Sequence, residues 1–196
     1  MTLYDHQIVK NDLPELPDCL YQYLWGRDGL YIRAERENLK ALIYHTATMP
    51  TRGLAEIKPE IQVPSRVPVE LLGGLLGYSA QCSPKWSLFY LLFEPSDDYN
   101  PWRMVIPNQL QAIGSSELVD PNNANAAKAL VEIRSKGAEL ASFSDEDDRS
   151  QTGFRFYAAL GMVDRSPEID LRIGIYGHFM SLAACNLFEL PSGVRD

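Results

Sequence analysis

The sequence predicts an α/β protein in which a mixed β-sheet packs against helices and follows a set of antiparallel strands. Residues 87–93 and 129–133 form apolar runs with the length of buried strands. Leucines recur at helical spacing within residues 71–76 and give one apolar stripe. The segment Gly26-Arg-Asp-Gly29 separates two aromatic-rich runs, and its glycines are typical of a hairpin turn.

Residues 1–64 are predicted to form a first domain, an N-terminal arm followed by a β-meander. Residues 1–18 are polar and contain two prolines, which fits either an extended arm or a tail packed on the domain. The runs that follow predict four antiparallel strands, at residues 20–25, 30–34, 39–47 and 53–63. Pro64 and Pro68 mark the boundary before a second domain, residues 65–196.

The second domain is predicted to open with a helix over residues 67–80, in which three glycines would permit close approach to the sheet. Strands over residues 87–93 and 102–106 then flank a polar loop with two prolines and form a hairpin. Further along the chain, residues 154–163 and 171–182 predict a final pair of strands.

Residues 122–143 allow two interpretations. Either a short helix with an asparagine cap leads into a strand over residues 129–133, or one alanine-rich helix continues to Phe143. Gly137 and the apolar run before it favour the strand, because glycine is a poor residue for a helix interior.

Composition and charge restrict the classes of function. The chain has 196 residues, a formal net charge of −8 and no basic stripe, which argues against nucleic-acid binding. No apolar run reaches the roughly 18 residues of a membrane-spanning helix, and the first residues lack the features of a secretory signal. Three widely spaced cysteines, Cys19, Cys82 and Cys185, fit reduced thiols and predict a cytoplasmic location.

A charged segment follows the strand predicted at residues 129–133. It begins with Arg134-Ser-Lys136 and, after the seven residues 137–143, continues with Ser144-Asp-Glu-Asp147. Side chains two residues apart on a strand point to the same face, so the two cations are expected to act together. This spacing resembles the signature of the JAB/MPN (JAMM) metallo-isopeptidase family, which is His-x-His, seven residues and Ser-x-x-Asp, with a glutamate upstream.

The resemblance covers residues 67–190 and implies a JAB/MPN-like, cytidine-deaminase-like fold. Its functional positions correspond here to Arg134, Lys136, Ser144, Asp147, and Trp86 or Ser87. The first two stand where the family has histidines, and the next two match the signature. The last position belongs to the glutamate, and neither tryptophan nor serine is a general base of the required kind.

The chemistry of these residues argues against a metal centre. Hydrolytic zinc needs three protein ligands and an open position for water. Charged Arg134 and Lys136 carry hydrogen-bond donors and no acceptor, so Asp147 is the single ligand that remains. We therefore expect no metal, no cofactor and no catalytic residue at this site. The hypothesis is that the two cations replace the charge of the metal and pair with Asp147.

The resemblance implies a catalytically inactive relative that works as a protein-binding or assembly module. The family acts on ubiquitin-like conjugates and contains inactive members that form dimers. It therefore implies a protein or peptide partner, such as a ubiquitin-like protein or a second copy of the chain. A groove beside Ser144 and Asp147 is a candidate site for a peptide tail or an anion, held against Arg134 and Lys136.

Two other functions stay open. An active hydrolase would need non-standard ligands, such as Asp147 with His178 or Asp148. A structural subunit of a larger complex would use the N-terminal arm and the net charge of −8. The acidic run over residues 144–148 is better explained as a helix start than as a calcium loop, because the calcium-loop spacing and its glycine are missing.

Overall fold

The computed structural model describes residues 2–118 and 123–196 of the chain. The chain divides into two compact units. The first consists of the residues up to Pro64 with residues 152–154 and 174–180, and the second of residues 65–151, 155–173 and 181–196. The first unit therefore takes in two short segments of the predicted second domain.

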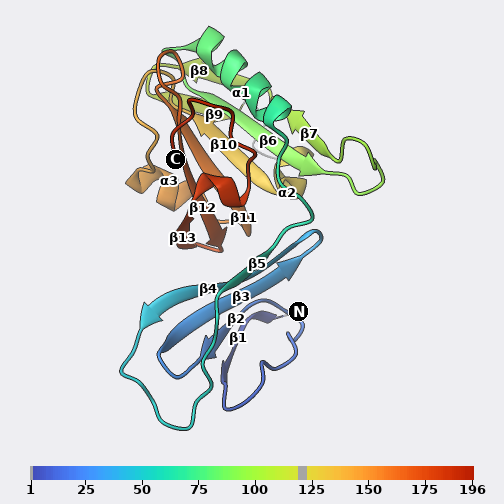
Figure 1. The fold of residues 1–196 in the computed structure, drawn as a ribbon, viewed down its shortest axis with the longest axis vertical. Helices are drawn as coiled ribbons and strands as arrows, with labels where there is room; N and C mark the ends of the chain where they lie inside the picture. The colour runs from blue at the N-terminus through green and yellow to red at the C-terminus, as the bar shows by residue number, and fades with distance from the viewer. Residues whose placement is uncertain (1, 119–122) are drawn as a thin grey trace. The chain divides into compact units, whose positions relative to one another are not determined.

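The first unit contains a five-stranded sheet with the strand order β1-β2-β3-β4-β5 (Figure 1). Its strands are β1 (Thr2–Ile8), β2 (Cys19–Trp25), β3 (Gly29–Arg36), β4 (Leu39–Ala47) and β5 (Glu60–Gln62). The four strands from β2 to β5 are antiparallel, as predicted. Part of the predicted arm is the strand β1, which pairs with β2 in parallel. The predicted strand over residues 53–63 is shortened to β5, which starts directly after Pro59, a residue without a backbone donor.

One face of this sheet buries an apolar cluster. Its members are Val9, Leu24, Tyr31, Leu42 and Ile57. Leu24 lies opposite Tyr31 in the strand register, so both side chains point to the same face. Along β3 both faces are buried in part, since Tyr31 and its neighbour Ile32 point to opposite faces and both are buried.

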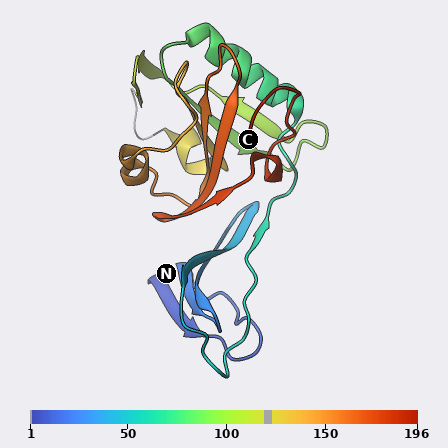
Figure 2. The same cartoon turned by 60° about the vertical axis from the view of Figure 1, so that its left-hand side comes forward.

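The larger sheet has six strands in the order β13-β12-β11-β10-β6-β7 (Figures 1 and 2). Its strands are β6 (Ser87–Phe93), β7 (Trp102–Val105), β10 (Val131–Ser135), β11 (Arg155–Gly161), β12 (Glu168–Ile175) and β13 (His178–Leu182). The central strand β10 runs parallel to β11 and antiparallel to β6. The predicted α/β class with a mixed sheet is therefore confirmed.

The helix α1 (Val69–Cys82) covers one face of this sheet. It buries Leu72 and Leu75, and the ring of Tyr78 lies 5.6 Å from the ring of Phe89 on β6. Because strand side chains alternate, Ser87 on β6 points to the same face as Phe89.

Two shorter helices, α2 (Ala124–Lys128) and α3 (Asp145–Ser150), lie on the opposite face. Ala126 of α2 packs against a cluster that includes Leu88 and Tyr90 of β6. A 3₁₀ turn over Ala184–Asn186 follows β13. The sheet is therefore covered on both faces, which explains why β6 and β11 are apolar along almost their whole length.

The strand interpretation of residues 122–143 is correct and the long-helix interpretation is wrong. Residues 119–122 lie outside the described ranges, and α2 ends at Lys128. β10 follows directly, and Gly137 then takes a φ of +61°, which is unfavourable for residues with a side chain. The positive φ ends the strand and starts the loop that leads to α3.

Two expectations for the second domain need correction, and one hairpin was not predicted. The run over residues 171–182 forms two strands, β12 and β13, because Tyr176 and Gly177 both take positive φ angles and make a tight turn. The segment after Pro107 contains an unpredicted hairpin of β8 (Gln109–Ala112) and β9 (Ser115–Leu118). The glycines of α1 are exposed, and a Cβ on any of them would touch nothing within 4 Å, so they do not serve helix–sheet contact.

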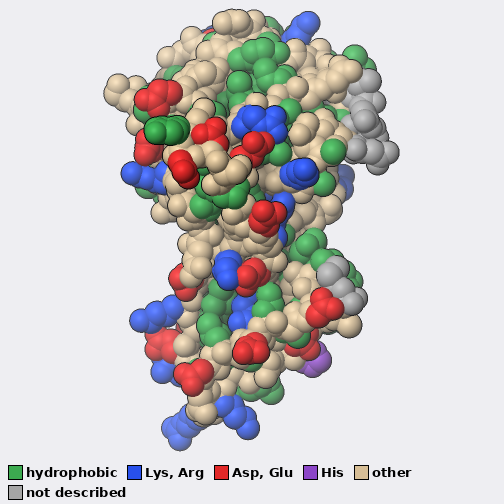
Figure 3. All heavy atoms as spheres, turned by 90° about the vertical axis from the view of Figure 1, so that its right-hand side faces the viewer, with side chains coloured by type: hydrophobic (Ala, Val, Ile, Leu, Met, Phe, Trp, Pro, Cys, Tyr) green, Lys and Arg blue, Asp and Glu red, His purple; other side chains and the backbone are tan. Residues whose placement is uncertain are grey.

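The surface carries charges of both signs. On the face drawn in Figure 3, acidic and basic side chains are interspersed and no broad basic area gathers. None of the helices in the described ranges is both long enough and apolar enough to cross a lipid bilayer.

Candidate functional site

The end of β10 brings two cations to one face of the larger sheet. Arg134 lies on β10, and Lys136 follows its last residue. Their side chains point the same way, and both reach the carboxylate of Asp147. The Arg134 Nη1 donates to Asp147 Oδ1 over 2.8 Å, and the Lys136 Nζ donates to Asp147 Oδ2 over 3.0 Å. The expected ion pairs with Asp147 are therefore present.

The Asp147 carboxylate is saturated with donors. Its Oδ2 atom also accepts from the backbone N–H and from the hydroxyl of Ser144, each over 2.8 Å. In all, the carboxylate accepts four hydrogen bonds, three at Oδ2 and one at Oδ1. The side chain of Asp147 is only 2% exposed and that of Lys136 only 5%. An anion bound to Arg134 and Lys136 would have to compete with the Asp147 carboxylate, which argues against the groove hypothesis.

The position of Asp147 is set by the start of α3. Ser144 is the N-cap, and its hydroxyl accepts from the Asp147 backbone N–H while the Asp147 carboxylate accepts from the Ser144 backbone. This reciprocal capping box satisfies two donors that a helix N-terminus leaves unpaired. Acids in the first turn also interact favourably with the helix dipole. The local sequence therefore explains both the helix and the direction of the Asp147 side chain.

Burial and hydrogen bonding act on Asp147 in opposite directions. Burial alone raises the pKa of the carboxyl group, because it disfavours the charged form. The donors of Ser144 and the ammonium of Lys136 outweigh burial, so the pKa of Asp147 lies below its usual range. The carboxylate therefore stays ionised between its two cations.

A second ion pair holds α3 to the sheet. Arg172 on β12 contacts Asp148 over 2.5 Å and donates to the side-chain oxygen of Gln151. Its guanidinium carbon lies 3.9 Å from the ring centre of Phe143. Because Asp147 binds β10 and Asp148 binds β12, the short helix is tied to two strands.

Of the two residues that the alignment offers at the glutamate position, only Trp86 belongs to this site. The Lys136 Nζ lies 4.9 Å from the centre of the Trp86 ring, and the indole N–H donates to Glu139 over 3.1 Å. Ser87 lies opposite Ser135 in the register, on the α1 face, and its hydroxyl is bonded to Gln111. Neighbouring residues of a strand point to opposite faces, and the sequence does not fix the register. It therefore could not decide whether Trp86 or Ser87 lies beside Lys136.

The seven-residue spacer is packed closely against the end of β11. The backbone N–H of Lys136 donates to Leu160, and the N–H of Met162 donates to Glu139. A Cβ at Gly161 would lie 2.5 Å from the Glu139 carbonyl oxygen and closer still to the backbone of Leu140 and Ala141. Only glycine fits there, and this contact fixes the path of the chain towards Ser144.

The substitution Gly161→Ala is therefore expected to destabilise the second unit by about 1–3 kcal/mol or more, because backbone atoms have to move. The matched control is Gly74→Ala in α1, where the added methyl meets nothing. Removing a glycine from a helix interior is expected to stabilise the protein by about 0.4–1 kcal/mol. Thermal or denaturant unfolding of both variants measures the difference, and equal stabilities would contradict the packing described for the spacer.

Two charged neighbours of the site were not singled out from the sequence. Glu132 accepts from Arg134 over 3.3 Å and also pairs with Arg155 of β11. The sequence could have indicated Glu132, because it alternates with apolar or small residues in step with Arg134 and Lys136. This spacing places all three side chains on one face of the strand. Asp170 on β12 is the other: burial raises its pKa, and the charges of Arg172 and Lys136 oppose the rise.

The residues present do not fit a metal ion. Arg134 and Lys136 have no lone pair to offer, and the Asp147 oxygens already accept four hydrogen bonds. Across residues 2–118 and 123–196, no three His, Cys, Asp or Glu side chains are grouped closely enough to hold a metal ion. The ligands of the hydrolase alternative have other contacts: Asp148 binds Arg172, and His178 is hydrogen-bonded to the Tyr23 hydroxyl over 3.0 Å.

Comparison with known proteins adds no assignment. Models of known protein families give no match to this chain, and a search of curated proteins gives none either.

Proposed function

We propose that this chain is a catalytically inactive relative of the JAB/MPN family that serves as a protein-binding or assembly module. The observation that carries the proposal is the ion triad of Arg134, Asp147 and Lys136. It stands at the positions that correspond to two metal ligands and the conserved aspartate of the family signature. Two positive side chains there replace the positive charge of a divalent ion, but they lack its ability to act as a Lewis acid.

The surroundings of the triad support a structural role for these residues. Trp86 stands at the glutamate position and covers the Lys136 ammonium in a cation–π contact, so a general base is replaced by an apolar lid. The loop over residues 137–143 packs closely against Gly161, and the capped start of α3 holds Asp147 in place. Both features support a role for these residues in stabilising the fold. A module of this kind contributes its surface to a partner and leaves any chemistry to other proteins.

Metal content and hydrolysis together test the proposal. The purified protein, incubated with zinc and then desalted, is expected to carry far less than one zinc per chain by elemental analysis. It is also expected to leave ubiquitin-like isopeptide conjugates intact. Stoichiometric zinc together with cleavage that a chelator abolishes would overturn the proposal. A light-scattering mass compared with the chain mass of 22.1 kDa shows whether the assembly role includes a homodimer.

A further inference from the structure

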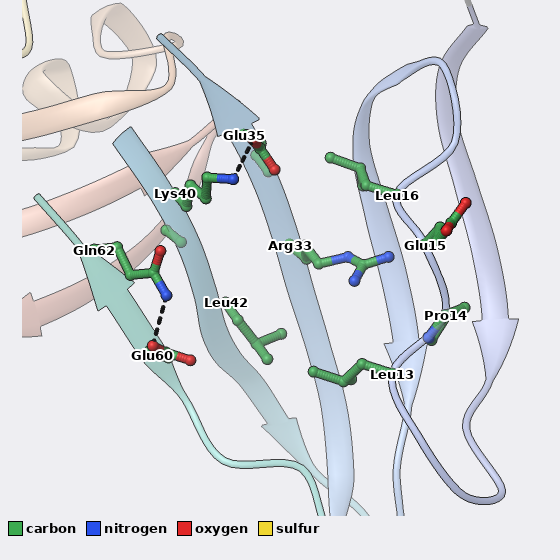
Figure 4. A pocket seen from close by; sticks show the side chains of 12 residues that line it. Leu13, Pro14, Glu15, Leu16, Arg33, Glu35, Lys40, Leu42, Glu60 and Gln62 are labelled. Carbon is green, nitrogen blue, oxygen red and sulfur yellow. Dashed lines mark hydrogen bonds and ion pairs between the residues drawn. The ribbon is translucent and has the colours of Figure 1, made fainter. Parts of the chain in front are cut away.

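The first unit contains a cavity of about 220 Å³ on the face of its sheet (Figure 4). The floor is made by β3, β4 and β5, and the loop over residues 13–16 lies across it. All of its lining residues belong to the first unit, so the cavity is separate from the ion triad. Its volume is below the roughly 300–1,000 Å³ of pockets for drug-sized molecules, which suits a smaller ligand.

Arg33 is the one cation of this cavity without an acidic partner. Within the described part of the chain, its guanidinium makes one hydrogen bond, from Nη2 to the side-chain oxygen of Gln22 over 2.6 Å. Its Nε is buried and has no partner at all. By contrast, Arg172 in the second unit is paired with Asp148. Burial lowers the pKa of Arg33, and the charges of Cys19 and Glu35 oppose this shift only in part.

The position of the Arg33 side chain is fixed by its hydrogen bond to Gln22. Gln22 is fully buried, and its amide nitrogen donates to Asp5 over 2.7 Å. This bond directs the Gln22 oxygen towards Arg33 and anchors one edge of the guanidinium. Figure 4 shows the Arg33 side chain extending from β3 towards the loop that carries Leu13 and Leu16. A planar guanidinium with free donors is suited to two parallel hydrogen bonds with a carboxylate.

The walls and the rim restrict the ligand further. The apolar residues that line the cavity are Leu13, Pro14, Leu16, Ala34, Ala41 and Leu42. The other cation, Lys40, is already paired with Glu35 over 2.5 Å. Glu15 and Glu60 also line the cavity, and their negative charge disfavours phosphates and other polyanions more strongly than a single carboxylate. The ligand that fits these features has one carboxylate attached to a small apolar group.

We propose that this cavity binds the carboxylate of a small apolar acid, either free or as the C-terminus of a peptide that ends in an apolar residue. The carboxylate pairs with Arg33 and the apolar group packs against the leucines. The inference does not depend on the proposed function, because no residue of the ion triad takes part.

Titration of the full chain tests this inference, with calorimetry or leucine methyl NMR as the readout. The probes are N-acetyl-leucine, its amide, and an acetylated tripeptide that ends in leucine with a free carboxylate. We expect the acids to bind about tenfold or more tightly than the amide, because the amide loses the charged hydrogen bonds. A tighter tripeptide assigns the site to peptide C-termini, and equal affinity of the two acids assigns it to free acids.

Two variants complete the test. Arg33→Gln is expected to remove the preference for acid over amide, whereas Arg52→Gln, at an exposed arginine of the same unit, is expected to retain it. Acid binding that survives Arg33→Gln would overturn the inference, as would equal binding of acid and amide by the natural protein. If Arg33→Gln does not fold, the inference is tested by the difference in affinity between the acid and the amide on the natural protein.

Discussion

Replacing Asp147 with alanine is expected to lower the free energy of unfolding by about 3–5 kcal/mol, because the buried Lys136 loses its counter-charge and Arg134 keeps only Glu132. The Lys136 ammonium is 5% exposed and cannot turn to water without opening the site. The capping box at Ser144 is lost as well, and loss of a cap costs roughly 0.5–2 kcal/mol by itself.

The control is Glu146→Ala, which removes an exposed acid from the same turn of α3. Surface substitutions of this kind change stability by about 0.5 kcal/mol or less. For a chain of this size the Asp147 variant is expected to melt roughly 6–20 °C below the natural protein, and the control close to it. Equal melting temperatures for the two variants would contradict a buried triad.

The Asp147→Asn variant adds a dependence on pH. The pKa of Asp147 is lowered in the folded protein, whereas the unfolded value is about 3.9. A lowered pKa stabilises the folded state above the unfolded pKa, and this stabilisation disappears as the pH falls through the folded value. The stability gap between the natural protein and Asp147→Asn is therefore expected to be constant above about pH 5 and to shrink below about pH 4. Denaturant unfolding across this range measures the gap, and a gap that widens in acid would contradict the assignment.

The double substitution R134H/K136H is expected to create a zinc site at the position of the ion triad. Both side chains leave β10 on one face, and their present head groups lie 2.8 and 3.0 Å from the Asp147 carboxylate. Imidazoles are shorter, so they vacate a space between β10 and Asp147. Zinc binds imidazole nitrogen and carboxylate oxygen at about 2.0–2.2 Å, and two imidazoles with one carboxylate complete a three-ligand set.

Elemental analysis after desalting is expected to give close to one zinc per chain for this variant, with a higher melting temperature in zinc than in chelator. The control is R52H/K58H, which introduces two imidazoles at exposed positions of the first unit and should bind no stoichiometric zinc. A folded R134H/K136H variant that binds no zinc would count against the alignment with the JAB/MPN signature. The single variant R134H should bind weakly, because Lys136 still occupies one ligand position.

The local elements followed from the sequence because their signals are local. The apolar run over residues 87–93 coincides with β6, and period-two spacing placed Arg134 and Lys136 on one face. The Ser-x-x-Asp spacing placed Asp147 at the start of a helix, where a serine cap directs its carboxylate. These features depend on bond geometry and on neighbours within a few residues.

Other features depend on partners far apart in the chain, and only the tertiary structure decided them. The pairing of β1 with β2 in parallel, the choice of Trp86 over Ser87, and the burial of Lys136 all require a register or a packing contact. The contact of Gly161 with the spacer and the hydrogen bond of Arg33 to Gln22 are of the same kind. The sequence alone determined which residues share a face, because side-chain direction repeats with a fixed period. Which charges are buried and compensated was decided by folding, because burial and pairing depend on segments that meet only in the folded chain.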